Sequence, residues 1–203
     1  MIRLFKEAEP TILAANRDAW TTEFTLGLDN RRYAIEDIRN ALRDETHRKC
    51  AYCESHIDHV AYENVEHILP KSERPDLVCD WPNLTLACPK CNTNKGTYYN
   101  LDCLLVNPYS DSPSVHLRWL GPMVIAITQD RGSMTISRLD LNRSGLIYRR
   151  YEALAKAQKL MVQVTNNPGP IGAAIDEDLQ RMQLDEAEYA AAVRALVATE
   201  ATT

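Results

Sequence analysis

Two Cys-x-x-Cys pairs constrain the fold of this chain more than any other feature of its sequence. They lie at Cys50–Cys53 and at Cys88–Cys91. One such pair brings two sulfurs of a single turn within reach of one metal ion. Two pairs supply the four thiolates of a tetrahedral Zn²⁺ site, which leaves no open position for a water or a substrate. The sequence therefore predicts a structural zinc site at Cys50, Cys53, Cys88 and Cys91 that holds the loop between the pairs.

The remaining cysteines and the apolar pattern suit a protein of a reducing compartment. Cys79 and Cys103 lie outside the pairs, and we interpret both as small buried thiols. No apolar run approaches the roughly 18 residues that a membrane-spanning helix needs, and residues 1–6 lack the apolar core of a secretory signal. We therefore expect a cytoplasmic protein with no membrane contact, in which paired cysteines bind metal.

Charge is distributed unevenly along the chain, whose net charge is −5. Residues 176–203 carry seven acidic and two basic side chains, whereas residues 142–166 carry five basic side chains and one acidic one. The basic segment is either a helix face that contacts phosphates or an ordinary solvated face. An acidic protein that acts on nucleic acid would need further binding surface, so a partner is expected.

The region around the cysteine pairs predicts a strand, a loop, a second strand and a helix. A helix over residues 33–47, preceded by a segment that follows Pro10, leads to the first pair. Short apolar segments at 65–69 and 84–87 are typical of strands, and Pro70 ends the first. The polar stretch at 71–82 contains Pro75 and Pro82 and is expected to be an irregular loop. A short helix is expected to begin near Asn92.

The second half of the chain predicts a small antiparallel β meander followed by helices. The predicted strands cover 115–119, 123–128 and 134–139. Asn142 is a good N-cap for a long helix over 143–165, which the Asn166–Pro170 segment ends, and a last helix covers 176–198.

These elements indicate an α+β protein, and its 203 residues suit one compact unit. We expect a helical lead-in at 1–49, the metal-binding core at 50–100 and a third segment at 101–203.

A second group of polar residues lies between and just after the cysteine pairs. Hydrolysis of a phosphodiester needs an activated water and positive charge near the phosphoryl oxygens. The His67 imidazole is a suitable base near neutral pH, and oxygens of Glu66 and Asn92 suit Mg²⁺ or Mn²⁺. Neighbouring strand residues point to opposite faces, so a shared site requires a bend at the end of the strand or a ligand contacted from the side.

Each of these residues also has an ordinary structural interpretation. Taken singly, His67 fits a hydrogen-bonded structural histidine, and Lys95 fits a solvated lysine on a helix. Asn83 fits a turn residue, and Asn92 fits a helix cap. Their joint arrangement around the cysteines favours a catalytic site, in which Lys95, and less clearly Lys71, contacts phosphate. Four other histidines could take the role assigned to His67: His56 and His59 are the main rival candidates, and His47 and His116 are weaker ones.

The whole pattern resembles the HNH endonucleases that have a zinc frame. The resemblance rests on the two Cys-x-x-Cys pairs, the Glu66–Pro70 segment (Glu-His-Ile-Leu-Pro), Asn83-Leu84, and Asn92 with Lys95. The flanking sequence extends this resemblance to the PtuB-like HNH subunits of Septu anti-phage systems, which are also found with some retrons. The flanking segments are Lys49–Glu54, Val65–Ser72, Asn107-Pro108 and Leu139–Arg143.

The resemblance implies a treble-clef-like ββα-metal core. His67 would be the general base, and Asn83 would hold the loop that positions it. Asn92 would replace the last histidine of the motif as a metal ligand, and Glu66 would take the acidic position where Asp is frequent. The family also implies a PtuA-like ATPase partner of the ABC/SMC type, with DNA as a more expected substrate than RNA.

The sequence thus predicts a metal-dependent endonuclease that is the effector subunit of a defence complex. The alternatives are a zinc-dependent module that binds nucleic acid without catalysis, and a protein-interaction adaptor.

Overall fold

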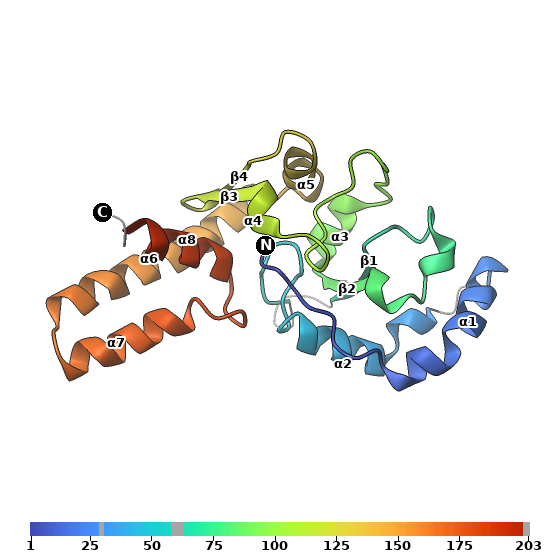
Figure 1. The fold of residues 1–203 in the computed structure, drawn as a ribbon, viewed down its shortest axis with the longest axis horizontal. Coiled ribbons are helices and arrows are strands. Elements are labelled where there is room, and N and C mark those ends of the chain that lie inside the picture. Colours follow the sequence, from blue (N-terminus) through green and yellow to red (C-terminus); the bar gives the residue numbers. More distant parts are fainter. Residues whose placement is uncertain (29–30, 58–62, 201–203) are drawn as a thin grey trace.

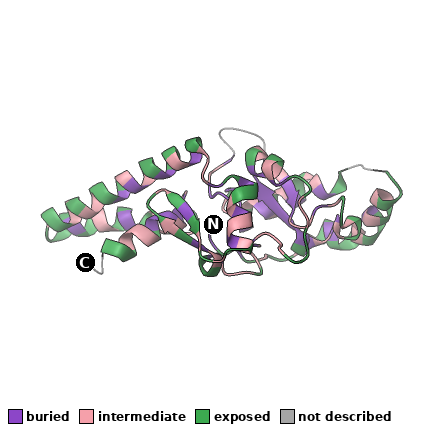
Figure 2. Ribbon diagram, turned by 90° about the horizontal axis from the view of Figure 1, so that it is seen from above, coloured by how far each residue is buried: buried purple, intermediate pink, exposed green. Residues whose placement is uncertain are grey.

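A computed structural model describes residues 1–28, 31–57 and 63–200, and they form an elongated molecule (Figure 1). Helices α6 (Ser144–Asn166), α7 (Pro170–Arg181) and α8 (Ala190–Glu200) make up one end, and α1 (Thr11–Thr25) lies at the other. Buried residues gather near the middle, whereas the α6–α7 end is largely exposed (Figure 2). No helix in the described ranges is long and apolar enough to cross a membrane.

The predicted strand, loop, strand and helix are confirmed around the cysteine pairs. Strand β1 (Asn64–His67) pairs antiparallel with β2 (Leu84–Ala87), with His67 opposite Leu84. Helix α3 (Pro89–Lys95) follows β2 directly. It begins earlier than predicted, because Cys88 is its N-cap and the Cys88 sulfur accepts a hydrogen bond from the Cys91 N–H at 3.4 Å.

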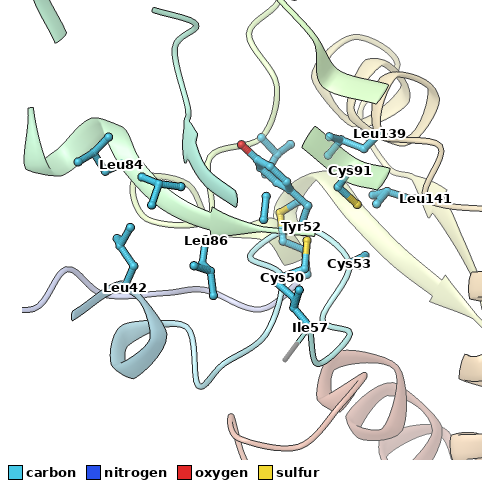
Figure 3. Packing of buried hydrophobic residues seen from close by; sticks show 14 of the residues in the cluster. Leu42, Cys50, Tyr52, Cys53, Ile57, Leu84, Leu86, Cys91, Leu139 and Leu141 are labelled. Carbon is cyan, nitrogen blue, oxygen red and sulfur yellow. The ribbon is translucent and has the colours of Figure 1, made fainter. Parts of the chain in front are cut away.

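The N-terminal helices enclose this core. Helix α2 (Glu36–Glu45), within the predicted range 33–47, packs on β2 and buries Ile38 and Leu42 completely. Leu42 faces Leu84 and Leu86 in the core (Figure 3). Helix α1 contacts the 3₁₀ turn Pro75–Leu77 in the loop between the two strands.

The predicted three-stranded meander is wrong in its third strand. Helix α4 (Pro113–His116) precedes the hairpin of β3 (Leu117–Leu120) and β4 (Met123–Ala126). The chain then forms helix α5 (Arg131–Leu139), which buries Gly132, Thr135 and Leu139 at helical spacing. A short apolar segment fits both the two-residue period of a strand and the 3.6-residue period of a helix. Here, packing on α3 and β4 favours the helix.

The long helix and its end at Asn166 are confirmed by α6, but the single last helix is wrong. The chain forms α7 and α8, separated by residues 182–189. The buried Lys49 ammonium donates hydrogen bonds to the carbonyls of Asp185 and, at 2.8 Å, of Ala187. Tyr189 has a left-handed backbone, with φ of 57°. A distant lysine therefore holds this segment in a non-helical path.

The sequence predicted Asn142 as the N-cap of α6, and this prediction is wrong. The Asn142 side chain instead bonds across to β4, accepting from the Val124 N–H at 2.9 Å and donating to the Val124 carbonyl at 2.8 Å. Arg143 takes the N-cap position without a side-chain cap.

The basic segment 142–166 is only partly a surface face. Arg150 is 1% exposed, donates to the Leu141 carbonyl at 2.7 Å and lies 4.7 Å from the Trp119 ring centroid. Burial lowers the Arg150 pKa to about 10. This value is still well above neutral pH, so the guanidinium keeps its charge inside the protein. Arg149, Lys156 and Lys159 remain exposed and available to a polyanion.

Candidate metal centre and active site

The sulfurs of Cys50, Cys53, Cys88 and Cys91 come together from the two turns predicted to bind zinc. All four lie within 4.8 Å of one another, and the Cys53 and Cys88 sulfurs are 3.9 Å apart. Zinc–sulfur bonds of about 2.3 Å in a tetrahedron place the sulfurs at about this separation. The donor set and its spacing therefore fit one Zn²⁺ ion. Figure 3 shows Cys50, Cys53 and Cys91 beside the buried leucines that surround the cluster.

Arg143, which was predicted as one of the bases of the 142–166 segment, contacts this cluster. Both terminal nitrogens of its guanidinium lie 3.7 Å from the Cys91 sulfur. Burial alone would lower the Arg143 pKa, but the neighbouring cysteine sulfurs raise it. The same side chain donates to the Asp140 carbonyl at 3.1 Å, so it links α5, α6 and the cysteines. The Leu139–Arg143 segment was part of the family resemblance, but nothing in the sequence indicated this contact, because 52 residues separate Arg143 from Cys91.

All the residues predicted to be catalytic except Asn83 line a single pocket of about 360 Å³. Glu66 and His67 of β1, Asn92 and Lys95 of α3, and Lys71 of the loop all contribute to its wall. The chain bends directly after His67, which is the last residue of β1. The bend at the strand end that a shared site requires is therefore present.

The pocket wall is positively charged, although the chain as a whole is acidic. Glu66 is the one acidic residue among its described lining, which also contains four basic residues. These are Arg31, Arg39, Lys71 and Lys95. Two of them, Arg31 and Arg39, come from the segment before the first cysteine pair, so distant parts of the chain add to the charge of the pocket wall.

The His67 ring is held by its surroundings in a defined orientation. Its Nε2 atom lies 2.9 Å from the Val78 carbonyl oxygen. A carbonyl oxygen only accepts hydrogen bonds, so Nε2 carries the proton and Nδ1 is the basic nitrogen of the neutral ring. The Tyr33 ring packs edge-on against the imidazole, with centroids 4.6 Å apart. Local periodicity had marked Tyr33 only as an apolar helix residue.

Glu66 is a buried carboxylate with one cationic partner. Its Oε1 atom is 2.6 Å from the Lys95 ammonium nitrogen, and both side chains are almost fully buried. Oε1 accepts no hydrogen bond of good geometry from the described residues. Burial raises the Glu66 pKa, and the Lys95 charge opposes that rise without cancelling it. Such an incompletely satisfied carboxylate fits the ligand set of a hard divalent cation.

Lys95 is buried and points into the protein. It is 4% exposed, and its ammonium also donates to the backbone carbonyl of His67 at 2.8 Å. The side chain therefore bridges the two neighbouring residues Glu66 and His67. The solvated-lysine interpretation does not apply, and the ammonium is directed at protein oxygens.

Asn83 is buried and is absent from the described lining of this pocket. Its Oδ1 atom accepts from the Leu69 N–H at 2.8 Å. Its Nδ2 atom donates to the Leu69 and Leu77 carbonyls at 3.0 and 3.1 Å. These bonds fasten both ends of the loop that carries the Val78 carbonyl to His67. Asn92, in contrast, is half-buried in the pocket wall, and its side chain makes no hydrogen bond within the described ranges.

The rival histidines that the structure describes lie away from this pocket. His56 donates its backbone N–H to Glu188 at 2.7 Å, His47 faces Glu186, and the His116 ring bonds the Thr128 hydroxyl at 3.1 Å. His59 lies outside the described residues. The described cysteines beyond the cluster are the buried Cys79 and the half-buried Cys103.

Similarity to known proteins agrees with this arrangement. Residues 50–97 match the HNH endonuclease family. The chain is 32% identical to a Septu protein PtuB of Bacillus thuringiensis over 82% of its own length, and it spans 66%, just under two thirds, of that relative. It is 26% identical to a Septu protein PtuB of Bacillus mycoides strain KBAB4, over 89% of this chain and 78% of the relative. Over most of its length the chain is therefore PtuB-like, and residues 50–97 are its HNH endonuclease domain.

Proposed function

We propose that this protein hydrolyses phosphodiester bonds of nucleic acid, DNA in preference to RNA, in a reaction that depends on a divalent metal. One observation carries the proposal: Glu66, His67 and Asn92 line a single positively charged pocket next to the four-cysteine cluster. A phosphate that enters this pocket would meet a base, oxygen ligands for a cation and several basic side chains. That combination is what phosphodiester hydrolysis requires.

His67 acts as the general base in this proposal. The Val78 carbonyl holds the proton on Nε2, so Nδ1 takes a proton from the attacking water. Tyr33 restricts rotation of the ring. Asn83 is a positioning residue, because its three hydrogen bonds close the loop that presents the Val78 carbonyl.

Glu66 and Asn92 hold the catalytic Mg²⁺ or Mn²⁺ ion, and the four cysteines hold a structural Zn²⁺ ion. A carboxylate and an amide oxygen, with substrate phosphate completing the shell, form an ordinary protein site for Mg²⁺. The divalent metal supplies positive charge for the phosphoryl group and the leaving oxygen. The closed set of thiolates serves the fold alone.

Lys95 acts as an internal counter-ion for Glu66, and this role predicts opposite effects on metal binding and on cleavage. Lys95→Met removes a positive charge 2.6 Å from a metal-binding oxygen, so Mn²⁺ binding should tighten roughly tenfold. It also removes the bond to the His67 carbonyl, so cleavage at saturating metal should slow. Calorimetric Mn²⁺ titration and cleavage rates measure the two effects.

The matched control is Lys90→Met, because Lys90 is exposed on the same helix α3. It should leave both quantities unchanged. Weaker Mn²⁺ binding in the Lys95→Met protein would contradict the counter-ion role and favour Lys95 as part of the metal-holding framework.

We also propose that the protein works as the effector of an anti-phage complex with a PtuA-like ATPase of the ABC/SMC type. Its similarity to proteins named Septu protein PtuB supports this assignment. The net charge of −5 adds to it, because a protein of this charge gains affinity for nucleic acid by using a partner's surface.

The test is to purify the chain together with an ATPase encoded beside it and to offer plasmid, phage DNA and total RNA. We expect cleavage that requires added Mg²⁺ or Mn²⁺, stops in excess EDTA and returns with Mn²⁺ while the zinc content stays constant. Binding without turnover under every metal condition would overturn the proposal and identify a non-catalytic binding module. The absence of both binding and turnover would favour an adaptor.

A further inference from the structure

A second hollow of about 820 Å³ opens beside the catalytic pocket. Its lining shares Lys95, Gly96 and Thr97 with that pocket, so the two hollows meet at the turn that follows α3. Beyond the turn, the lining continues over Tyr98–Leu101 and Arg138 of α5. The shared lining gives a nucleic-acid strand held in the catalytic pocket a continuous path onto this surface.

Arg138 and Tyr98 form a stacked pair on the floor of the second hollow. The guanidinium carbon of Arg138 lies 4.7 Å from the Tyr98 ring centroid. Tyr98 donates its hydroxyl proton to the Cys103 carbonyl at 2.7 Å, which holds the ring in place. Arg138 is exposed, and no ion pair with a carboxylate is found for it in the described part of the chain. The pair thus presents a preformed cationic surface to solvent.

The position of this pair relative to the catalytic pocket is also set. Asn94 of α3 donates its side-chain amide to the Leu139 carbonyl at 3.2 Å, next to Arg138 in α5. The two helices pack against each other. On the rim, the Leu101 side chain is 73% exposed and adds an apolar surface. Apolar, aromatic and guanidinium groups together suit the face of a base better than a phosphate alone.

We propose that the Arg138–Tyr98 pair binds an unpaired base of the substrate strand next to the cleaved phosphate. Unpaired bases stack on aromatic rings and on arginine planes, whereas a regular duplex keeps its bases stacked inside and offers mainly phosphates. The preferred substrate class is therefore single-stranded or locally unpaired nucleic acid. This inference rests on the proposed nuclease function, because it extends the same site.

The test uses full-length His67→Ala protein, which we expect to bind substrate without cutting it, and compares Arg138→Ala and Arg138→Lys in that background. The probes are a single strand with 2-aminopurine and a duplex of the same sequence. We expect Arg138→Ala to weaken single-strand binding about 10- to 100-fold and to abolish stacking-induced quenching of the fluorescent base. Duplex affinity should change less than about threefold. Arg138→Lys keeps the charge and should recover only a small part of the loss.

Equal weakening on both probes, or full recovery with Arg138→Lys, would overturn the inference and identify a simple phosphate contact. Absence of single-strand binding by the His67→Ala protein would also overturn it. Lys156→Ala, which removes an exposed base on α6, is the control for general charge loss.

Cleavage by the unmodified protein is measured separately. Suppose that Arg138→Ala abolishes the quenching as expected, but the unmodified protein cleaves no substrate. That result would support the base-binding surface and refute the nuclease proposal.

Discussion

His67→Ala is expected to reduce nucleic-acid cleavage by about 10²- to 10⁴-fold, the contribution typical of a positioned general base. The physical reason is that Nδ1 is the basic nitrogen of a ring whose Nε2 donates to the Val78 carbonyl. The measurement is the single-turnover cleavage rate at saturating divalent metal. Zinc content and thermal unfolding are followed in parallel, because the substitution lies outside the cysteine cluster and should leave zinc bound.

His116→Ala is the matched control for this experiment. The His116 ring bonds the Thr128 hydroxyl and lies outside the described lining of the catalytic pocket. This variant should cleave at the unmodified rate. A His67→Ala protein that cleaves as fast as the His116→Ala protein would contradict the role assigned to His67.

Cys88→Ser is expected to lose bound zinc and to unfold the core around β1, β2 and α3. Cys88 is a member of the sulfur cluster and the N-cap of α3. Serine is a good N-cap, so the substitution removes a zinc ligand while the cap of α3 is kept, and the loss is assigned to the metal. Structural zinc in small domains contributes on the order of 10 kcal/mol or more to folding. We expect zinc per chain to fall well below one, and the unfolding temperature to fall by more than about 10 °C. Metal analysis and circular dichroism measure both.

Cys103→Ser provides the comparison, because Cys103 is half-buried and lies outside the cluster. Its zinc content should match that of the unmodified protein. If the Cys88→Ser protein kept one zinc per chain and its full unfolding temperature, the four-cysteine site would be wrong.

Local patterns predicted the core of this fold well, and the second half less well. The strands β1 and β2 and the helix α6 have clear apolar patterns and clear ends, and all three are present. Residues 134–139 were wrongly predicted as a strand, because their short apolar pattern fits the period of a strand as well as that of a helix. The helix there depends on close packing: a Cβ atom at Gly132 would lie 2.5 Å from the His116 carbonyl oxygen. Such a contact has no signature in the local sequence.

The candidate site shows the same division between local and distant information. Glu66, His67 and Asn92 were predicted from their place around the cysteines, and the pocket brings them together. The roles of Arg143 and Tyr33 beside the site were not predicted, because their contacts with Cys91 and His67 join residues far apart in the chain. Lys95 was predicted in the site but directed at phosphate, whereas its ammonium faces Glu66.

The sequence by itself determined the metal-binding frame and the chemical groups of the site. Both depend on spacing within a turn or a short strand, and local geometry sets such spacing. Only the tertiary structure decided the direction of Lys95, the loop that orients His67 and the basic wall drawn from Arg31, Arg39 and Lys71. These features result from burial and hydrogen bonding between distant segments. Their energies depend on which surfaces meet in the folded chain, and local periodicity does not report that.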